Sequence, residues 1–252
     1  MEYIIEKKIY FLSDFHLGAP NYQESLIREK KVVAFLDDIK YKASELFIVG
    51  DMFDFWFEYD KVIPKGYTRL LGKLAELSDA GVPIQFFIGN HDMWMNGYFE
   101  QELNIKVYTE PTVFERGEKK LLIGHGDGLG PGDRGYKFIK KIFRNKFCKW
   151  LFGKVHPDFG IKLANYFSKK SRIKTGSSDE IFLGEANEWL IQFCNDTLIK
   201  QHYDYFIFGH RHLPLNIALK PNSYYINLGD WIRNFTYATF DGQTVKLHKW
   251  EN

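Results

Sequence analysis

Five runs of β-forming residues in this chain each end in a short motif rich in metal-binding side chains. The runs are 9–12, 46–49, 84–88, 121–123 and 205–208, and they are followed by Ser13-Asp14-Phe15-His16, Gly50-Asp51-Met52-Phe53-Asp54, Gly89-Asn90-His91-Asp92, Gly124-His125-Gly126-Asp127 and Gly209-His210-Arg211-His212. Ligands of open α/β sheets bind beyond the carboxyl ends of the strands. Five such motifs in order therefore predict an α/β protein whose strand ends meet around a metal site.

The order of the predicted elements narrows the architecture. Strands and helices alternate from residue 3 to about 99, and the helices at 22–40 and 66–80 carry apolar residues at spacings of three and four. The rear of the chain is instead rich in strands, with a hairpin within 107–123 and further strand candidates at 204–208, 216–219, 223–227 and 235–249. This pattern predicts two packed sheets with flanking helices.

Length, cysteine content and the N-terminus limit the class of protein. A chain of 252 residues fits one large domain with an inserted subdomain. Two cysteines far apart in sequence do not suggest a disulfide framework. Residues 1–14 are charged and lack the apolar core of a signal peptide, and no apolar run reaches the roughly 20 residues of a membrane-spanning helix. We therefore expect a reduced, cytoplasmic protein.

One segment is strongly basic. Residues 134–174 contain 13 Lys or Arg and one acid, a net charge of +12, whereas the whole chain carries only +2 and the remainder therefore about −10. A basic block in an otherwise acidic protein predicts a surface for an anionic partner, such as a phospholipid, a phosphate-rich ligand or a nucleic acid.

The same segment has the apolar spacing of helices. This pattern is typical of core-facing helices with a solvated basic face, and equally of helices that cover an active site and meet an anionic lipid surface. We do not expect nucleic-acid binding, because aromatics mixed with aliphatics at helical spacing favour an apolar pocket over a groove for stacked bases. The residues of the stripe are Phe138, Ile139, Ile142, Phe143, Phe147, Trp150 and Leu151.

The strand-end motifs carry the chemistry of a two-metal phosphoesterase. Two divalent ions about 3.5–4 Å apart can acidify a water and neutralise a phosphoryl group. Carboxylate, imidazole and amide oxygen suit Mn²⁺, Fe²⁺ and Zn²⁺. We expect Asp51 to bridge the ions, because it directly follows a strand-end glycine. The other predicted ligands are Asp14, His16 and His212 at one ion and Asn90, His125 and His210 at the other.

His91 follows a predicted ligand and is our candidate catalytic residue. An imidazole beside the scissile phosphate can donate to a phosphoryl oxygen or protonate the leaving group. Asp54 is the candidate partner that orients this ring. We expect Asn90 and His91 to contact the substrate phosphate as well. A lone histidine is more often structural, and we interpret the three outside these motifs (His156, His202 and His248) in that way.

The motifs, taken in order, resemble those of the calcineurin-like metallophosphoesterase superfamily over residues 14–212. This resemblance implies a four-layer α/β/β/α sandwich and a binuclear centre, for which we expect manganese. The seven predicted ligands match its pattern one by one. The basic segment would then be a helical cap at 131–190, inserted into a core made of 1–130 and 191–252.

A narrower resemblance is to UDP-2,3-diacylglucosamine hydrolases of lipid A biosynthesis. It rests on Gly50-Asp51-Met52-Phe53-Asp54-Phe55-Trp56 and on His125-Gly126-Asp127 followed by Asp133 and Tyr136. It implies cleavage of the pyrophosphate of a lipid-linked UDP-sugar to UMP and diacylglucosamine 1-phosphate, at the cytoplasmic face of the inner membrane. Asp133 and Tyr136 would bind the glucosamine phosphate, while Phe143 and Phe147 of the cap would shelter acyl chains.

The sequence departs from the hydrolase pattern at three positions: His91 stands where many members have Arg, and Arg211 and Leu213 flank the last ligand where Thr and Arg are more familiar. Two alternatives therefore stay open. One is another phosphoesterase on this scaffold, such as a nucleotide pyrophosphatase, a phosphodiesterase or a phosphoprotein phosphatase. The other is a non-catalytic metal-binding scaffold, which we would expect to have lost ligands.

Overall fold

A computed structural model describes residues 7–132, 134–175, 181–220 and 222–251. The elements in chain order are β1 (Lys8–Leu12), α1 (Tyr22–Ile39), β2 (Ala43–Val49), α2 (Thr68–Asp79), β3 (Ile84–Phe87), α3 (Tyr98–Leu103), β4 (Lys106–Tyr108), β5 (Thr112–Arg116), β6 (Lys119–Ile123), α4 (Arg134–Phe143), α5 (Lys146–Phe152), α6 (Pro157–Thr175), α7 (Trp189–Leu198), β7 (Tyr205–Phe208), β8 (Pro214–Lys220), β9 (Ser223–Leu228), β10 (Thr236–Phe240) and β11 (Val245–Lys249).

The strands form two sheets. The first has the order β11-β10-β1-β2-β3-β4, in which β1 to β4 run parallel and β10 and β11 form an antiparallel edge. The second has the order β5-β6-β7-β9-β8, with the predicted hairpin as β5 and β6. Strands β6, β7 and β9 run parallel to one another. The carboxyl ends of the parallel strands in each sheet therefore gather at one edge, where the polar motifs follow.

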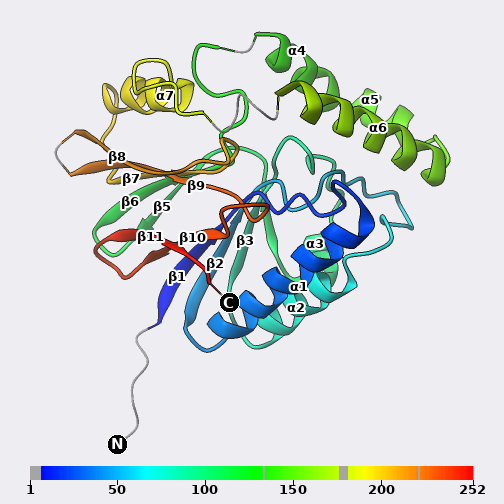
Figure 1. Cartoon of the computed structure of the whole chain (residues 1–252), viewed down its shortest axis with the longest axis horizontal. Coiled ribbons are helices and arrows are strands. Elements are labelled where there is room, and N and C mark those ends of the chain that lie inside the picture. The colour runs from blue at the N-terminus through cyan, green and yellow to red at the C-terminus, as the bar shows by residue number, and fades with distance from the viewer. Residues whose placement is uncertain (1–6, 133, 176–180, 221, 252) are drawn as a thin grey trace, which may run out of the picture.

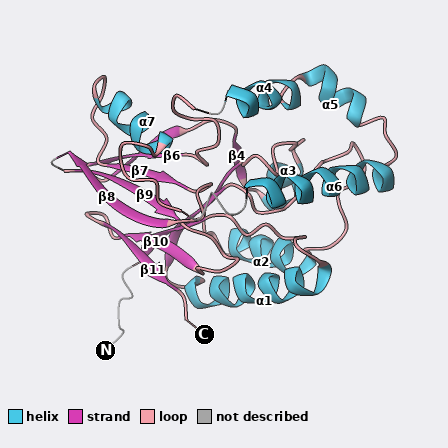
Figure 2. Cartoon of the chain, turned by 45° about the horizontal axis from the view of Figure 1, so that its top comes forward, coloured by secondary structure: helices cyan, strands magenta, loops and turns pink. Residues whose placement is uncertain are grey.

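Alternating side chains on the central strands enter different cores. Phe11 of β1 lies in the core between the two sheets, whereas its neighbour Leu12 packs toward α1 and α2. On β7, Ile207 faces the core between the sheets and Phe206 faces α7. Strands buried on both faces need continuous apolar runs, which the sequence supplies. The predicted α/β/β/α sandwich is confirmed, with α1 to α3 outside the first sheet and α7 outside the second (Figures 1 and 2).

Helix α7 is an element that the sequence analysis missed. It begins at Trp189, inside the segment assigned to the cap, and buries Leu190, Ile191 and Cys194 against the second sheet. The spacing of these three residues is a helical signal that was available in the sequence.

Helices α4, α5 and α6 form a separate group, drawn in green in Figure 1, on the side of the loops that follow β2 and β3. Trp94, in the loop after β3, packs against Phe143 of α4 and Phe152 of α5, with ring centroids 5.4 and 4.7 Å apart. The assignment of 131–190 as an inserted cap stays a prediction. Among the described helices, none combines the length and apolar character needed to cross a membrane.

Candidate metal centre

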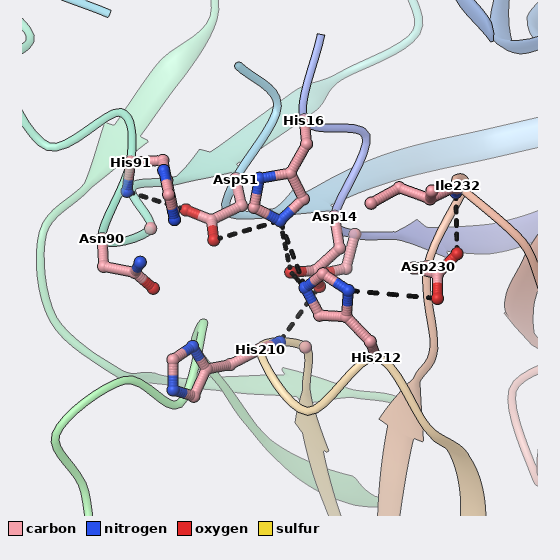
Figure 3. Close-up of polar contacts among 12 residues, drawn as sticks. Asp14, His16, Asp51, Asn90, His91, His210, His212, Asp230 and Ile232 are labelled. Atoms are coloured by element: carbon pink, nitrogen blue, oxygen red, sulfur yellow. Dashed lines mark hydrogen bonds and ion pairs between the residues drawn. The ribbon is translucent and has the colours of Figure 1, made fainter. Parts of the chain in front are cut away.

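Asp14, after β1, presents one carboxylate oxygen to two histidines (Figure 3). Its Oδ2 atom accepts hydrogen bonds from the Ser13 hydroxyl and from the backbone amide of His210 (3.0 Å). Its Oδ1 atom lies 3.5 Å from Nε2 of His16 and 3.2 Å from Nε2 of His212. Hydrogen bonds therefore fix one oxygen of this carboxylate, while the other faces imidazole nitrogens of two different loops.

Asp51, after β2, lies between the two predicted groups of ligands. Its Oδ1 atom accepts the backbone amide of His91 at 2.9 Å. Its Oδ2 atom lies 3.5 Å from Nε2 of His16, in one group, and 3.2 Å from Nε2 of His125, in the other. The same Nε2 atom of His125 is 3.2 Å from Oδ1 of Asn90. One oxygen of Asp51 is thus shared by both groups, which is the geometry of a bridging ligand.

The rings of His125 and His212 are oriented by groups that lie near their Nδ1 atoms, on the side away from the other ligands. Nδ1 of His125 donates to the backbone carbonyl of Val49 at 2.9 Å, so that Nε2 faces Asp51. Nδ1 of His212 lies 4.0 Å from the Asp230 carboxylate. Groups that hold the distal nitrogen of an imidazole fix its tautomer and leave the other nitrogen available as a metal ligand.

The backbone at the ligands is unusual. Five of the seven predicted ligands adopt the left-handed region at φ values from 43° to 69°. This conformation is unfavourable for a non-glycine residue, and its concentration at one site is typical of functional loops. Close approach adds a second constraint at Gly89, where a Cβ atom would overlap the Asp51 carboxylate. The five residues are Asp14, His16, Asp51, His210 and His212.

Burial and mutual interaction fix the charges of this group. Burial lowers the pKa of His16 to about 3 and that of His210 to about 4, so both rings are neutral near pH 7. Burial opposes ionisation of Asp51, but the positive charge of the His125 imidazolium outweighs it and holds the pKa of this carboxyl well below its usual range. The pKa of Asp14 is lowered in the same way, chiefly by His212. Against the opposing effect of burial, Asp51 raises the pKa of His125 well above its usual value, and Asp14 raises that of His212. Because metal ions bind neutral imidazoles and ionised carboxylates, metal binding would displace protons from these two rings.

The arrangement fits divalent metal ions. Oδ1 of Asp14 is buried without a hydrogen-bond donor, and Nε2 of His16 faces Nε2 of His212 at 3.1 Å. A buried acceptor among convergent nitrogen lone pairs calls for a cation. Within the described residues, three sets of ligand atoms converge to within 4.8 Å of one another, namely Asp14, His16 and His212; His16, Asp51 and His91; and Asp51, His125 and His210.

The structure places His91 beside the predicted ligands, with its ring 4.9 Å from that of His16. Its Nδ1 atom donates to the backbone carbonyl of Asp54 at 2.9 Å, whereas the Asp54 carboxylate is 3.7 Å away. Asp54 therefore holds the ring mainly through its main chain. The hydroxyl of Ser168, on α6, also lies 3.2 Å from this nitrogen and brings the predicted cap into contact with the site.

The predicted substrate-binding residues lie around this centre in different settings. Tyr136 of α4 donates to the carboxylate of Asp127 at 2.5 Å, next to the loop of His125. Phe143 is 42% exposed and packs on Trp94, and Phe147 is 66% exposed. Asp133 lies outside the described residues.

Asp230 is a supporting residue that the sequence analysis missed. Besides approaching His212, its carboxylate accepts the amides of Ile232 and Arg233 at 2.7 and 2.6 Å. The side chain of Asn234 donates both to the Asp230 carboxylate at 2.8 Å and to the His212 carbonyl at 2.9 Å. Asp230 follows a glycine at the end of β9, so the same strand-end pattern that indicated the predicted ligands was present here.

Comparison with known proteins defines the class. A model of the calcineurin-like phosphoesterase family matches residues 7–214. The chain therefore belongs to this family and is a metal-dependent hydrolase of phosphoesters, as the motifs predicted. The family implies divalent metal ions, which agrees with the ligand sets described above.

The most similar relatives carry a more specific name than the family does. A UDP-2,3-diacylglucosamine hydrolase of Porphyromonas gingivalis is 40% identical over 261 residues, which cover 98% of this chain and 99% of the relative. Hydrolases of the same name from Proteus mirabilis and Histophilus somni are 30% and 28% identical. They match over 88% and 89% of this chain and over 90% and 92% of their own lengths. The predicted resemblance to this hydrolase family is confirmed.

Removal of metal ions is expected to destabilise the fold. Without cations the buried Oδ1 atom of Asp14 has no hydrogen-bond donor, and the strained ligand loops lose their common partner. Saturating metal at about 100 times its dissociation constant contributes roughly 2.7 kcal/mol, or about 5–10 °C in Tm for a chain of this size. Differential scanning calorimetry before and after chelation measures the change. An unchanged Tm, with metal analysis showing that the ions were removed, would contradict the prediction.

Proposed function

We propose that this protein hydrolyses the pyrophosphate of UDP-2,3-diacylglucosamine to UMP and 2,3-diacylglucosamine 1-phosphate, a step of lipid A biosynthesis. The observation that carries the chemistry is Oδ2 of Asp51, which is shared by two groups of metal-binding side chains. The substrate is supported by relatives of that name that match nearly the whole chain, the first of them 40% identical.

We assign the site residues according to this geometry. Two divalent ions, with manganese proposed in preference to iron or zinc, would be held by the seven predicted ligands and would supply an acidified water and neutralise the phosphoryl oxygens. His91 stands beside the ligands with its Nδ1–H donating to the Asp54 carbonyl. With a second proton on Nε2, the ring is an imidazolium that can donate to a phosphoryl oxygen or protonate the leaving group, after which Nε2 is left unprotonated. Asn90 would contact the same phosphate.

The cap helices would bind the rest of the substrate. Tyr136 lies next to the His125 loop and, with Asp133, is proposed to bind the glucosamine phosphate. Aromatic rings line the contact between the cap and the loops after β2 and β3, where Phe57 and Phe152 lie 4.8 Å apart. Phe143 and Phe147 are proposed to extend this apolar surface toward the acyl chains.

Phe147→Ser tests the acyl-binding role. The ring is largely exposed, so the variant is expected to fold normally, in contrast to a change at Phe143, which packs on Trp94. Burying a phenylalanine side chain contributes roughly 1.5–3 kcal/mol, so we expect KM for the diacylated substrate to rise by about tenfold or more. Hydrolysis of bis(p-nitrophenyl) phosphate, which has no acyl chains, should hardly change.

Ile199→Ser is the matched control, because Ile199 is 78% exposed and lies after α7, away from the cap. Its KM for the diacylated substrate should equal that of the unmodified protein. Equal effects of Phe147→Ser on both substrates, or no effect on either, would argue against acyl binding by this part of the cap.

We also propose that the cap meets an anionic membrane surface on the cytoplasmic face. Bulky apolar side chains are exposed on α4, α5 and α6, among lysines and arginines. Basic amphipathic helices with exposed aromatic residues bind at the interface of anionic bilayers. Co-sedimentation with vesicles that contain anionic lipid, compared with neutral vesicles, tests this. The exposed residues include Phe138, Phe147, Trp150, Phe159, Tyr166 and Phe167.

A further inference from the structure

Arg211 lies between two metal ligands, His210 and His212, and its side chain reaches a different partner. Nε and Nη2 of Arg211 donate to the two carboxylate oxygens of Glu188, each at 3.0 Å. This side-on pair is well shielded, since the Glu188 side chain is only 2% exposed and that of Arg211 15%. Nη2 also donates to the carbonyl of Ile181 at 3.0 Å. Bidentate pairs of this kind fix direction as well as distance.

Glu188 and Ile181 lie between α6 and α7, in the last part of the segment assigned to the cap, where the chain returns from helices α4 to α6 to the second sheet. We call residues 181–188 the outgoing neck. The Glu188 carboxylate also accepts a hydrogen bond from the amide of Leu183 at 3.1 Å. This hydrogen bond connects the beginning of the outgoing neck to its last residue. Glu188 is the N-cap residue of α7, which is anchored in the core. Arg211 therefore contacts both ends of the outgoing neck from a single loop.

The chain enters the cap through residues 130–132, and this segment packs against Trp189, which directly follows Glu188. A Cβ atom on Gly132 would overlap the ring of Trp189, the first residue of α7, so only glycine permits this close approach. Lys137 of α4 donates to the carbonyl of Gly130 in the same segment. The entering and outgoing connections of the cap thus meet beside the residue that Arg211 holds.

We infer that Arg211 is a positioning residue that fastens the outgoing neck to the loop of metal ligands and so holds the cap over the centre. The conformation of the loop 209–212 supports this role. His210 and His212 both have positive φ values, and their rings belong to two of the groups of metal-binding side chains. One short loop therefore carries two ligands and, between them, the side chain that secures the cap.

Hydrogen exchange of residues 181–192 tests this inference without reference to the substrate. In Arg211→Met and Glu188→Gln these amides should exchange faster than in the unmodified protein, because the outgoing neck opens more often. Arg211→Lys keeps the charge but cannot form the two-pronged pair, so its exchange should lie between those of the unmodified protein and Arg211→Met. The effect of the double variant should be smaller than the sum of the two single effects, since both single changes remove the shared Arg211–Glu188 pair.

The second readout rests on the proposed function. If the cap is correctly seated for only about one tenth of the time, KM for the diacylated substrate should rise about tenfold in Arg211→Met. Metal content and the hydrolysis of bis(p-nitrophenyl) phosphate should stay close to those of the unmodified protein. Should the unmodified protein fail to hydrolyse the diacylated substrate, the proposed function fails, while hydrogen exchange still decides the role of Arg211.

Arg116→Met is the matched control. Arg116 makes the same side-on pair with Glu45, at 2.8 and 2.7 Å, on strands β5 and β2, outside the cap and its connections. This variant should leave both the exchange of 181–192 and the KM unchanged. The inference is overturned if exchange of 181–192 in Arg211→Met equals that of the unmodified protein. It is also overturned if Arg211→Met loses metal or loses activity on both substrates equally, because Arg211 would then act on His210 and His212 alone.

Discussion

Asp51→Ala is expected to abolish turnover. Its Oδ2 atom lies within 3.5 Å of imidazole nitrogens from both groups of ligands, so a single substitution removes a ligand from each. The loss also removes the acceptor for the His91 amide, which orients the catalytic candidate. Since metal ions contribute several kcal/mol to such reactions, kcat should fall by at least about 10³-fold. Metal analysis should show fewer than two ions for each chain.

Asp204→Ala controls for the loss of a buried carboxylate. Asp204 is 8% exposed and accepts the amide of Lys120 at 2.9 Å, before β7 and away from the metal-binding side chains. We expect this variant to lose stability while keeping its metal ions and its kcat. Full activity of folded, purified Asp51→Ala protein would show that the two-metal assignment is wrong.

His91→Ala is expected to lower kcat by about 10²–10⁴-fold, the usual contribution of a positioned acid or base. The metal content should be kept, because the seven predicted ligands remain. The backbone amide of residue 91 also still binds Asp51 in this variant. Atomic absorption and single-turnover kinetics on the same preparation separate the two effects.

His91→Gln tests the same role with a side chain that can still donate a hydrogen bond but cannot transfer a proton. If His91 protonates the leaving group, Gln should be as impaired as Ala with a poor leaving group, and both should recover with p-nitrophenolate, which needs no proton. If His91 only donates to a phosphoryl oxygen, Gln should retain more activity than Ala with both leaving groups. Loss of metal from either variant would contradict the assignment and make His91 a ligand.

Much of the centre could be predicted because its side chains follow the ends of apolar strands. Asp14, Asp51 and His125 each stand within two residues of such a run, and parallel strands bring their carboxyl ends together whatever the loops do. The layered fold was predictable for the same reason, because runs such as 46–49 are apolar on both faces. These signals are local in sequence, and topology makes them converge.

The interactions that support the predicted site residues could not be predicted in this way, because they depend on contacts that the sequence does not display. Asp54 holds His91 through a main-chain carbonyl, and such a contact has no side-chain signature in the sequence. The pair of Arg211 and Glu188 joins residues 23 positions apart across two loops, and only the folded chain shows that they meet. Helix α7 was missed because its short apolar spacing directly follows the exposed apolar residues of the segment before it. The residues around a site are thus harder to predict than its ligands.

The most direct test of the central claim is UMP release from UDP-2,3-diacylglucosamine by the purified protein with manganese. UDP-N-acetylglucosamine, which lacks the two acyl chains, and a chelator-treated sample are measured in parallel. We predict rapid release from the diacylated compound, little from the unacylated sugar nucleotide and none after chelation. Failure to release UMP from the diacylated compound, while bis(p-nitrophenyl) phosphate is still hydrolysed, would contradict the proposed substrate and leave only the metal-dependent phosphoesterase.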